Sequence, residues 1–296
     1  MATAPITETM PLSLAERLKA YVELTKPRIA TLILIISMSA FFLAEGSEPN
    51  WLLALYNLLA TSTLAAGIFA LNHVAEKDYD PLMRRTDGRP LPSGRLQPEQ
   101  ALFFGLAMTI ASVILSVLAL NMVATAIVVF TAASYLLVYT PLKRKTAHHT
   151  ALGALSGATP PLLGWAAAQG TLDPRAWILF GILFFWQFPH FLSIDIMYRE
   201  DYERAGMLVL PVVDKSGKKV AAEILGALAG LLVVSVLPIF TPLAGPGYGA
   251  VAAGLGIWFL ADGVRAVRAG TRPAARRLLK TSVFYLPLLF IAMIVL

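Results

Sequence analysis

Asn72, Glu76 and Asp80 are the residues of this sequence whose types and spacing most suggest chemistry. They lie four residues apart at the end of a long apolar run. A helix that continued through them would place all three on one face, with a drift of about 40° per step. Mg²⁺ is commonly held by one or two carboxylates together with substrate phosphates. The spacing therefore predicts a metal and diphosphate site at the end of this run.

The loop after this row is rich in arginine, and guanidinium groups match phosphate oxygens without a glycine-rich phosphate loop. Its arginines are Arg84, Arg85, Arg89 and Arg95. A solvated, charge-balanced loop is the alternative, and any one of these residues would fit it. The complete set fits that alternative less well, because acids beside a bilayer are costly unless they are used.

The composition predicts a polytopic membrane protein built from helices. Hydrophobic residues make up 57% of the 296 residues and charged residues only 14%, with a mean hydropathy of +0.69. The apolar runs are long and continuous, which favours helical spans over the short alternating segments of a β-barrel. The absence of cysteine excludes disulfides, thiolate metal sites and cysteine nucleophiles.

Nine apolar runs predict nine transmembrane helices. All of the 24 Lys and Arg residues except Arg175 lie in alternate connections, so the N-terminus is predicted to be cytoplasmic and the C-terminus outside. Topology and contacts with anionic lipid or phosphate account for the net charge of +6 without a nucleic-acid partner. The predicted runs are 29–45, 51–75, 100–119, 121–140, 148–168, 175–198, 218–240, 248–264 and 280–296.

The chain divides into two predicted parts. Residues 1–28 form a cytoplasmic N-terminal segment, whose stretch 12–24 resembles an amphipathic helix on the membrane surface. A solvated helix start is the alternative. Residues 29–296 form the intramembrane domain. Within it, His190 and Asp195 are ionisable groups at membrane depth and therefore functional candidates. We expect Asp195 to pair with His190 or with an arginine.

Several sequence blocks resemble a known family. The Asn72, Glu76 and Asp80 row, followed by RPLPSG, resembles the first signature of the UbiA superfamily of intramembrane prenyltransferases, with Glu in place of the more usual middle Asp. Further blocks look like the protohaem IX farnesyltransferase (haem O synthase) branch, and the resemblance runs from about residue 21 to the C-terminus. These blocks are LTKPR, YTPLKRKT, GA-x-PPLLGW, PHF, YR-x-DY, AG-x-x-x-LP and SVFYLPLLF.

The resemblance implies an all-α UbiA-like bundle with a central cavity open to the cytoplasmic face. It implies an enzyme that transfers a farnesyl group from farnesyl diphosphate to the vinyl group of protohaem IX (haem b), giving haem O and diphosphate, with Mg²⁺ bound through the diphosphate. Membrane lipid and haem-copper oxidase assembly factors are the other expected partners. The absence of a long Arg- and Ser-rich leader favours the bacterial plasma (inner) membrane.

The resemblance also assigns roles to residues. Asn72, Glu76 and Asp80, joined by Asp201, are expected to hold the metal, and Tyr198 or Tyr202 to face the allylic cation. His190 is expected to contact the porphyrin. The expected contacts to substrate are Lys26, Arg28, Arg84, Arg85, Arg89, Lys143, Arg144 and Arg199.

Three other functions stay open on the sequence. A sister enzyme of the same fold could prenylate a quinone precursor or another aromatic acceptor, and only the PHF and YR-x-DY blocks argue against it. A transporter would scatter polar residues through its helices, whereas the acids here cluster in two loops. A non-catalytic haem-binding assembly factor would leave extracted haem without a farnesyl group.

Overall fold

The computed structural model describes residues 13–296, so the first twelve residues of the predicted N-terminal segment lie outside the described part. Helix α1 (Leu14–Leu24) begins with a capping box, in which Ser13 and Glu16 each accept a hydrogen bond from the other's backbone N–H. Ala20 and Leu24 of α1 are buried, whereas Leu14, Leu18 and Val22 are exposed. An apolar exposed face suits a helix lying on the membrane, which stays a prediction.

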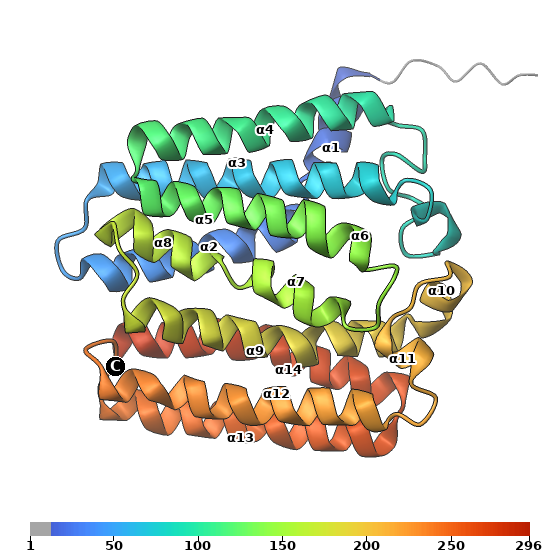
Figure 1. The fold of residues 1–296 in the computed structure, drawn as a ribbon. Helices are drawn as coiled ribbons and strands as arrows, with labels where there is room; N and C mark the ends of the chain where they lie inside the picture. The colour runs from blue at the N-terminus through green and yellow to red at the C-terminus, as the bar shows by residue number, and fades with distance from the viewer. Residues whose placement is uncertain (1–12) are drawn as a thin grey trace, which may run out of the picture.

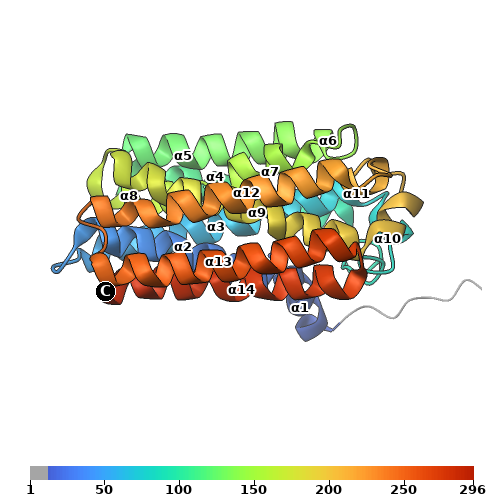
Figure 2. The ribbon, with the colours of Figure 1, turned by 90° about the horizontal axis from the view of Figure 1, so that it is seen from below.

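The rest of the chain is a bundle of long helices that run side by side (Figures 1 and 2). Helix α3 packs on α4, α2 on α8, and α9 on both α12 and α14. No strand occurs within residues 13–296. The long helices are α2 (Pro27–Glu45), α3 (Trp51–Glu76), α4 (Pro98–Ala119), α5 (Met122–Ala133), α9 (Pro174–Met197), α12 (Lys218–Val236), α13 (Pro246–Ala269) and α14 (Arg272–Val295).

Eight helical segments of the described chain are long and apolar enough to cross a membrane, and the predicted count of nine is not confirmed. Helix α5 reaches spanning length through a π-helical segment, η2 (Ser134–Tyr139), and the short α6 (Thr140–Leu142). The predicted boundary near Asn121 is confirmed. Its side chain accepts from the N–H of Ala124 at 2.9 Å, which caps α5, and donates to the carbonyl of Ala166 at 2.7 Å.

The predicted span 148–168 is not one helix but two. Helix α7 (His149–Gly157) ends before Thr159, and α8 (Pro160–Gln169) begins with two prolines. A proline has no N–H to donate to the preceding turn, so an unbroken helix across this point would lose hydrogen bonds. On α8, a Cβ at Gly164 would lie 1.9 Å from the carbonyl oxygen of Ser37. Glycine there lets α8 pack tightly on α2.

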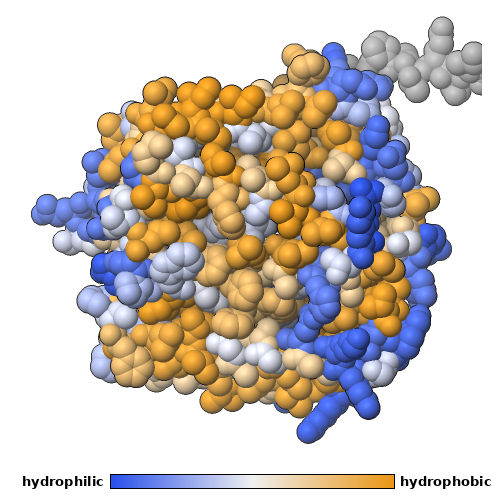
Figure 3. All heavy atoms as spheres, in the orientation of Figure 1, coloured by the Kyte–Doolittle hydropathy of each residue, from blue (hydrophilic) through white to orange (hydrophobic). Residues whose placement is uncertain are grey.

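The outside of the bundle is largely apolar, and most of its hydrophilic residues lie at the end on the right of Figure 3, with a smaller group on the left. Large side chains such as Phe103, Leu118, Leu137 and Phe240 are at least 73% exposed, as expected for a surface in contact with lipid. The charged end holds the loop after α3, its 3-10 turn η1 (Asp80–Leu82), and the short helices α10 (Arg199–Arg204) and α11 (Leu210–Val213). All loops predicted to be cytoplasmic therefore meet at one end.

Candidate active site

The predicted ligand row lies at the end of α3, but α3 does not run through it. The helix ends at Glu76, and Asp80 starts the 3-10 turn η1. Pro81 would prevent the α-helix from running on through Asp80, because proline cannot donate a hydrogen bond to the carbonyl of Lys77. The hydroxyl of Thr86 donates to the backbone carbonyl of Asp80 at 2.8 Å and fixes the turn. The helix therefore does not continue through the row, yet Asn72, Glu76 and Asp80 are all buried at one place.

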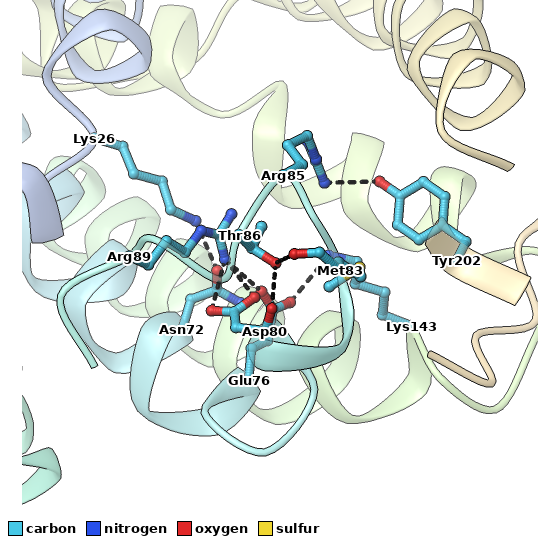
Figure 4. A network of polar contacts seen from close by, with 10 residues as sticks. All are labelled: Lys26, Asn72, Glu76, Asp80, Met83, Arg85, Thr86, Arg89, Lys143 and Tyr202. Carbon is cyan, nitrogen blue, oxygen red and sulfur yellow. Dashed lines mark hydrogen bonds and ion pairs between the residues drawn. The ribbon is translucent and has the colours of Figure 1, made fainter. Parts of the chain in front are cut away.

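Arg89 joins the two acids of the row (Figure 4). Its Nη1 donates to both carboxylate oxygens of Asp80, at 2.7 and 2.8 Å, and lies 3.4 Å from Oε2 of Glu76. The side chain of Asp80 is fully buried, and that of Glu76 is only 7% exposed. Two buried carboxylates would repel one another, and the shared guanidinium offsets that repulsion.

Two lysines from other parts of the chain complete the cluster. The ammonium of Lys143, from the end of α6, lies 2.9 Å from Oε1 of Glu76. Lys26, which precedes α2, donates to Oδ1 of Asn72 at 2.8 Å and lies 5.1 Å from the ring centre of Phe69. The structure thus brings together the predicted residues Lys26, Asn72, Glu76 and Lys143 from three separate segments.

The surroundings of these charged groups shift their pKa values. Burial, together with the nearby Arg89, lowers the pKa of Lys26 to about 7. Burial also raises the pKa of Asp80, and the Arg89 ion pair opposes that rise. Lys143 keeps its proton, because the Glu76 carboxylate raises its pKa and outweighs the effect of burial.

The Lys26 pKa of about 7 predicts a pH effect. Lys26 is cationic below that pH and neutral above it, so the site loses one positive charge as the pH rises from 6 to 8. We expect kcat/KM for a prenyl diphosphate to fall over this interval, since this ratio reports ionisations of the free enzyme. Lys26→Arg keeps its charge and should lack the fall. If kcat/KM falls equally in the parent and in Lys26→Arg, the ionisation belongs to the diphosphate substrate and not to Lys26.

The donor set fits Mg²⁺. It consists of the amide oxygen of Asn72 and the carboxylates of Glu76 and Asp80, all hard oxygen ligands. Within residues 13–296 no cluster of three or more His, Asp or Glu side chains could hold a metal alone. Mg²⁺ rarely needs such a cage, because it keeps several waters and shares its coordination with substrate phosphates.

Arg85 connects the loop after α3 to α10. Its Nη2 donates to the hydroxyl of Tyr202 at 3.0 Å, and its guanidinium lies 5.1 Å from the ring centre of Tyr198. Tyr202 is buried, and burial raises its pKa to about 12, so its hydroxyl stays protonated. In the same region, the guanidinium of Arg144 packs on the ring of Tyr79 at 4.3 Å. The two acid-rich segments predicted from the sequence therefore meet.

Other predicted residues stand apart from the cluster. Asp201 pairs with Arg204 at 3.1 Å and shares no hydrogen bond with the Asn72 row among the described residues. Arg28 and Arg84 are exposed, and Arg199 is half-buried. None of these three arginines forms a side-chain hydrogen bond or ion pair within residues 13–296. Their roles, and that of Asp201 as a metal ligand, stay predictions.

His190 lies deeper, between α9 and α14. Its Nδ1 lies 2.8 Å from the hydroxyl of Ser282, and its ring stacks on Trp186 at 4.5 Å. The indole of Trp186 donates to the carbonyl of Ser282, which fixes this arrangement. The predicted pairing of Asp195 with His190 or an arginine is wrong, because Asp195 faces Nε2 of His149 at 3.6 Å. The Nδ1 contact leaves Nε2 of His190 available to a ligand.

A cavity of about 470 Å³ lies beside the cluster, lined in part by Lys26, Arg85 and Arg89. His73 also lines it, and both of its ring nitrogens are buried without a partner. An anion in this cavity would meet three basic side chains and a potential hydrogen-bond donor, beside the two carboxylates of Glu23 and Asp87 that also line it. The sequence interpretation assigned no role to His73 or to Thr86. Only the fold brings them to the site.

Comparisons with known proteins agree with this geometry. Residues 33–293 match the sequence profile of the UbiA prenyltransferase family. The chain belongs to this family. The match covers every element of the site except α1 and Lys26. The predicted UbiA resemblance is therefore confirmed.

Relatives within the UbiA family cover nearly the whole chain. A protein of Solibacter usitatus is 45% identical over 92% of this chain and 97% of its own length. One of Opitutus terrae is 40% identical over 93% of each chain. Both are named "Protoheme IX farnesyltransferase".

Solved UbiA-type structures share the fold. A structure from work on digeranylgeranylglyceryl phosphate synthase superposes with a TM-score of 0.80 at 22% identity, covering 95% of this chain and 98% of that one. A UbiA homologue from Aeropyrum pernix K1 gives 0.72 at 16% identity, covering 90% and 96%. The protein is therefore an integral membrane protein with the UbiA fold.

Proposed function

We propose that the protein transfers a farnesyl group from farnesyl diphosphate to the terminal vinyl carbon of protohaem IX. A water molecule then adds to the cation left on the other vinyl carbon, giving haem O and diphosphate, which takes up the proton released. The observation that carries this function is the identity of 38–45% to relatives named for that reaction, over most of the chain. The cluster at the end of α3 supports it, because it combines oxygen ligands for a metal with several bases for phosphate oxygens.

The donor half of the reaction belongs to the α3 cluster. Asn72, Glu76 and Asp80 would hold Mg²⁺, which when bound neutralises the diphosphate and makes it a better leaving group. A UbiA homologue from Archaeoglobus fulgidus, with a TM-score of 0.65 and 16% identity, was solved with DMAPP and Mg²⁺, which supports this ligand class. Arg89 and Lys143 now neutralise the acids, and they would turn to phosphate oxygens when the metal takes their place.

The acceptor half belongs to α9 and α10. Tyr198 and Tyr202 present aromatic rings beside the loop after α3, where a ring face stabilises a nearby cation. His190, through its available Nε2, contacts the porphyrin. The interior of the bundle is apolar, so the allylic cation meets the vinyl carbon before it meets water.

Substitution by Phe is expected to have different effects at Tyr198 and at Tyr202. Tyr202→Phe removes the acceptor of the Arg85 hydrogen bond, and we expect kcat/KM to fall about tenfold, the effect of one charge-assisted hydrogen bond. Tyr198 makes no such bond with any residue of 13–296 and contributes its ring, so Tyr198→Phe should change the rate by less than about threefold. Tyr198→Leu removes the ring and should cost more. Equal losses in both Phe variants would contradict these roles.

The orientation of the protein follows from its basic loops. We place the end that carries these loops in the cytoplasm of a bacterial cell and the C-terminus on the other side of the plasma membrane. Residues 1–28 then form a cytoplasmic segment before the intramembrane domain. Haem-copper oxidase assembly factors stay the predicted protein partners.

A reconstituted assay tests the function. Purified protein in lipid vesicles receives farnesyl diphosphate, Mg²⁺ and either haem b or 4-hydroxybenzoate, an aromatic acceptor of the sister-enzyme alternative. We expect mass spectrometry to find a farnesyl group on the haem only. Farnesylated benzoate would favour the alternative. Unchanged haem that stays bound to the protein would favour a non-catalytic haem-binding factor.

A further inference from the structure

A second basic cavity lies between the end of α9 and the start of α14. Its volume is about 400 Å³, and its lining residues are Met197, Tyr198, Arg272, Pro273 and Arg276. We propose that this cavity binds the two propionate carboxylates of the haem acceptor, through Arg272 and Arg276. The inference rests on the proposed function and assigns a recognition site to its acceptor.

The charges of this cavity lack an acidic partner. Arg272 and Arg276 are four residues apart on α14 and so share one face. Neither forms an ion pair with an acid in the described part of the chain. Two neighbouring arginines behave differently, because Arg265 and Arg277 both pair with Asp262, at 2.8 and 3.0 Å. Two uncompensated guanidiniums in one cavity fit a pair of carboxylates, which each guanidinium can bind through two parallel hydrogen bonds.

Tyr198 places this cavity next to the donor site. Its ring centre lies 5.1 Å from the guanidinium of Arg85 and 5.8 Å from that of Arg272. Arg85 belongs to the loop after α3 and lines the cavity beside the acid cluster. One aromatic ring therefore connects the basic groups for the diphosphate with those for the acceptor. Carboxylates bound here would hold the acceptor at the mouth of the bundle, beside the donor.

The distance along the helices from this cavity to His190 is compatible with the distance from the propionates of a haem to its iron. Six residues of α14 separate Arg276 from Ser282, the partner of His190, which corresponds to about 9 Å along the helix. Seven residues of α9 separate His190 from Met197, or about 10 Å. Protohaem carries both propionates on one edge and its iron at the centre. With the propionates in the cavity, the ring would extend into the bundle and bring its iron to the level of His190.

Porphyrin binding without farnesyl diphosphate tests the inference apart from catalysis. The probes are zinc protoporphyrin IX and its dimethyl ester, titrated by fluorescence into protein held in nanodiscs of zwitterionic lipid. We expect Arg276→Gln, and likewise Arg272→Gln, to raise the Kd of the diacid about tenfold, the effect of a lost charge-assisted contact. The ester should bind the parent and both variants alike. Arg268→Gln is the matched control, because Arg268 is an exposed arginine of the last turn of α13, at the same end of the bundle, and does not line the cavity.

Three results would overturn the inference. One is equal diacid binding by the parent, Arg272→Gln and Arg276→Gln. Another is an equal loss of affinity for diacid and ester, which would indicate a change of shape rather than a lost carboxylate contact. The third is a difference between the variants and the parent that appears only with anionic lipid, which would assign the arginines to lipid headgroups.

Kinetics separates this inference from the proposed function. In the reconstituted assay we expect Arg276→Gln to raise KM for haem b about tenfold, with kcat and KM for farnesyl diphosphate unchanged. If the parent is active and both arginine variants keep its KM for haem, the function holds and the cavity assignment fails. If the parent binds the diacid in preference to the ester but farnesylates no haem, the proposed function fails and the carboxylate site stands.

Discussion

Asp80→Asn is expected to lower the rate of farnesyl transfer by about a hundredfold or more, the scale seen when a charge that stabilises a transition state is removed. The substitution keeps the shape of the side chain and the turn that Thr86 fixes through the backbone carbonyl of Asp80. It removes one of two carboxylates that would hold Mg²⁺, and the amide offers a weaker ligand. The rate is measured in vesicles with saturating haem b and farnesyl diphosphate, over a range of Mg²⁺ concentrations.

Asp78→Asn is the matched control for this substitution. Asp78 lies two residues earlier but is exposed, and it forms no ion pair within residues 13–296. We expect its rate to stay within about twofold of the parent, because a solvated surface charge contributes little. If both variants lose activity equally, general loop charge matters and the metal assignment is wrong. If Asp80→Asn keeps the parent rate at every Mg²⁺ concentration, Asp80 is not a metal ligand.

The sequence predicted the members of the α3 cluster better than their geometry. Spacing by four residues identified Asn72, Glu76 and Asp80, because the types and order of ligands are local properties of the chain. A helix that continued through the row would have carried all three, but α3 ends at Glu76 and Asp80 starts a separate 3-10 turn. The ligands still converge, since the turn from Glu76 to Asp80 folds the second acid back towards Arg89. The turn therefore brings the three ligands together, as one face of a continuous helix would have done.

For the transmembrane spans, too, the sequence predicted the location of the segments better than their backbone geometry. Apolar runs predict where the chain crosses the membrane, and most boundaries agree with the helices within a few residues. The run 148–168 is as apolar as the others, yet it is broken before Pro160 and Pro161. Hydropathy depends on amino-acid composition and not on whether a residue has a backbone N–H, so the hydropathy pattern predicted one span for this run. The two prolines themselves indicate the break, because neither can donate a backbone hydrogen bond within a helix.

Contacts between distant segments could not be predicted from the sequence. Arg85 and Tyr202 are 117 residues apart, and nothing in either segment indicates the other. Arg272 and Arg276 appeared only as bases that set the topology, and their position beside Tyr198 depends on the packing of α14 on α9. Likewise, the choice of His149 rather than His190 as the neighbour of Asp195 follows from how α7 packs on α9.

Arg89→Gln is expected to lower the melting temperature by several degrees in Mg²⁺-free buffer. The substitution leaves the buried carboxylates of Glu76 and Asp80 without their shared counter-charge, and breaking a buried ion pair typically costs about 3–5 kcal/mol. Burial already raises the pKa of Asp80. Without Arg89 that carboxylate takes up a proton more readily, which limits the loss. Melting is followed by tryptophan fluorescence in detergent.

Mg²⁺ should then stabilise the variant more than it stabilises the parent. In the parent, a metal ion must displace Arg89 from the two acids, whereas in Arg89→Gln Asp80 has no cationic partner among the described residues and Glu76 keeps only Lys143. A ligand that binds only the folded state raises stability with its concentration relative to Kd, so the tighter metal site gives the larger shift. Arg84→Gln is the control, because Arg84 is an exposed arginine of the same loop. Equal Mg²⁺ shifts in the parent and in both variants would mean that Arg89 does not compete with a metal for these carboxylates.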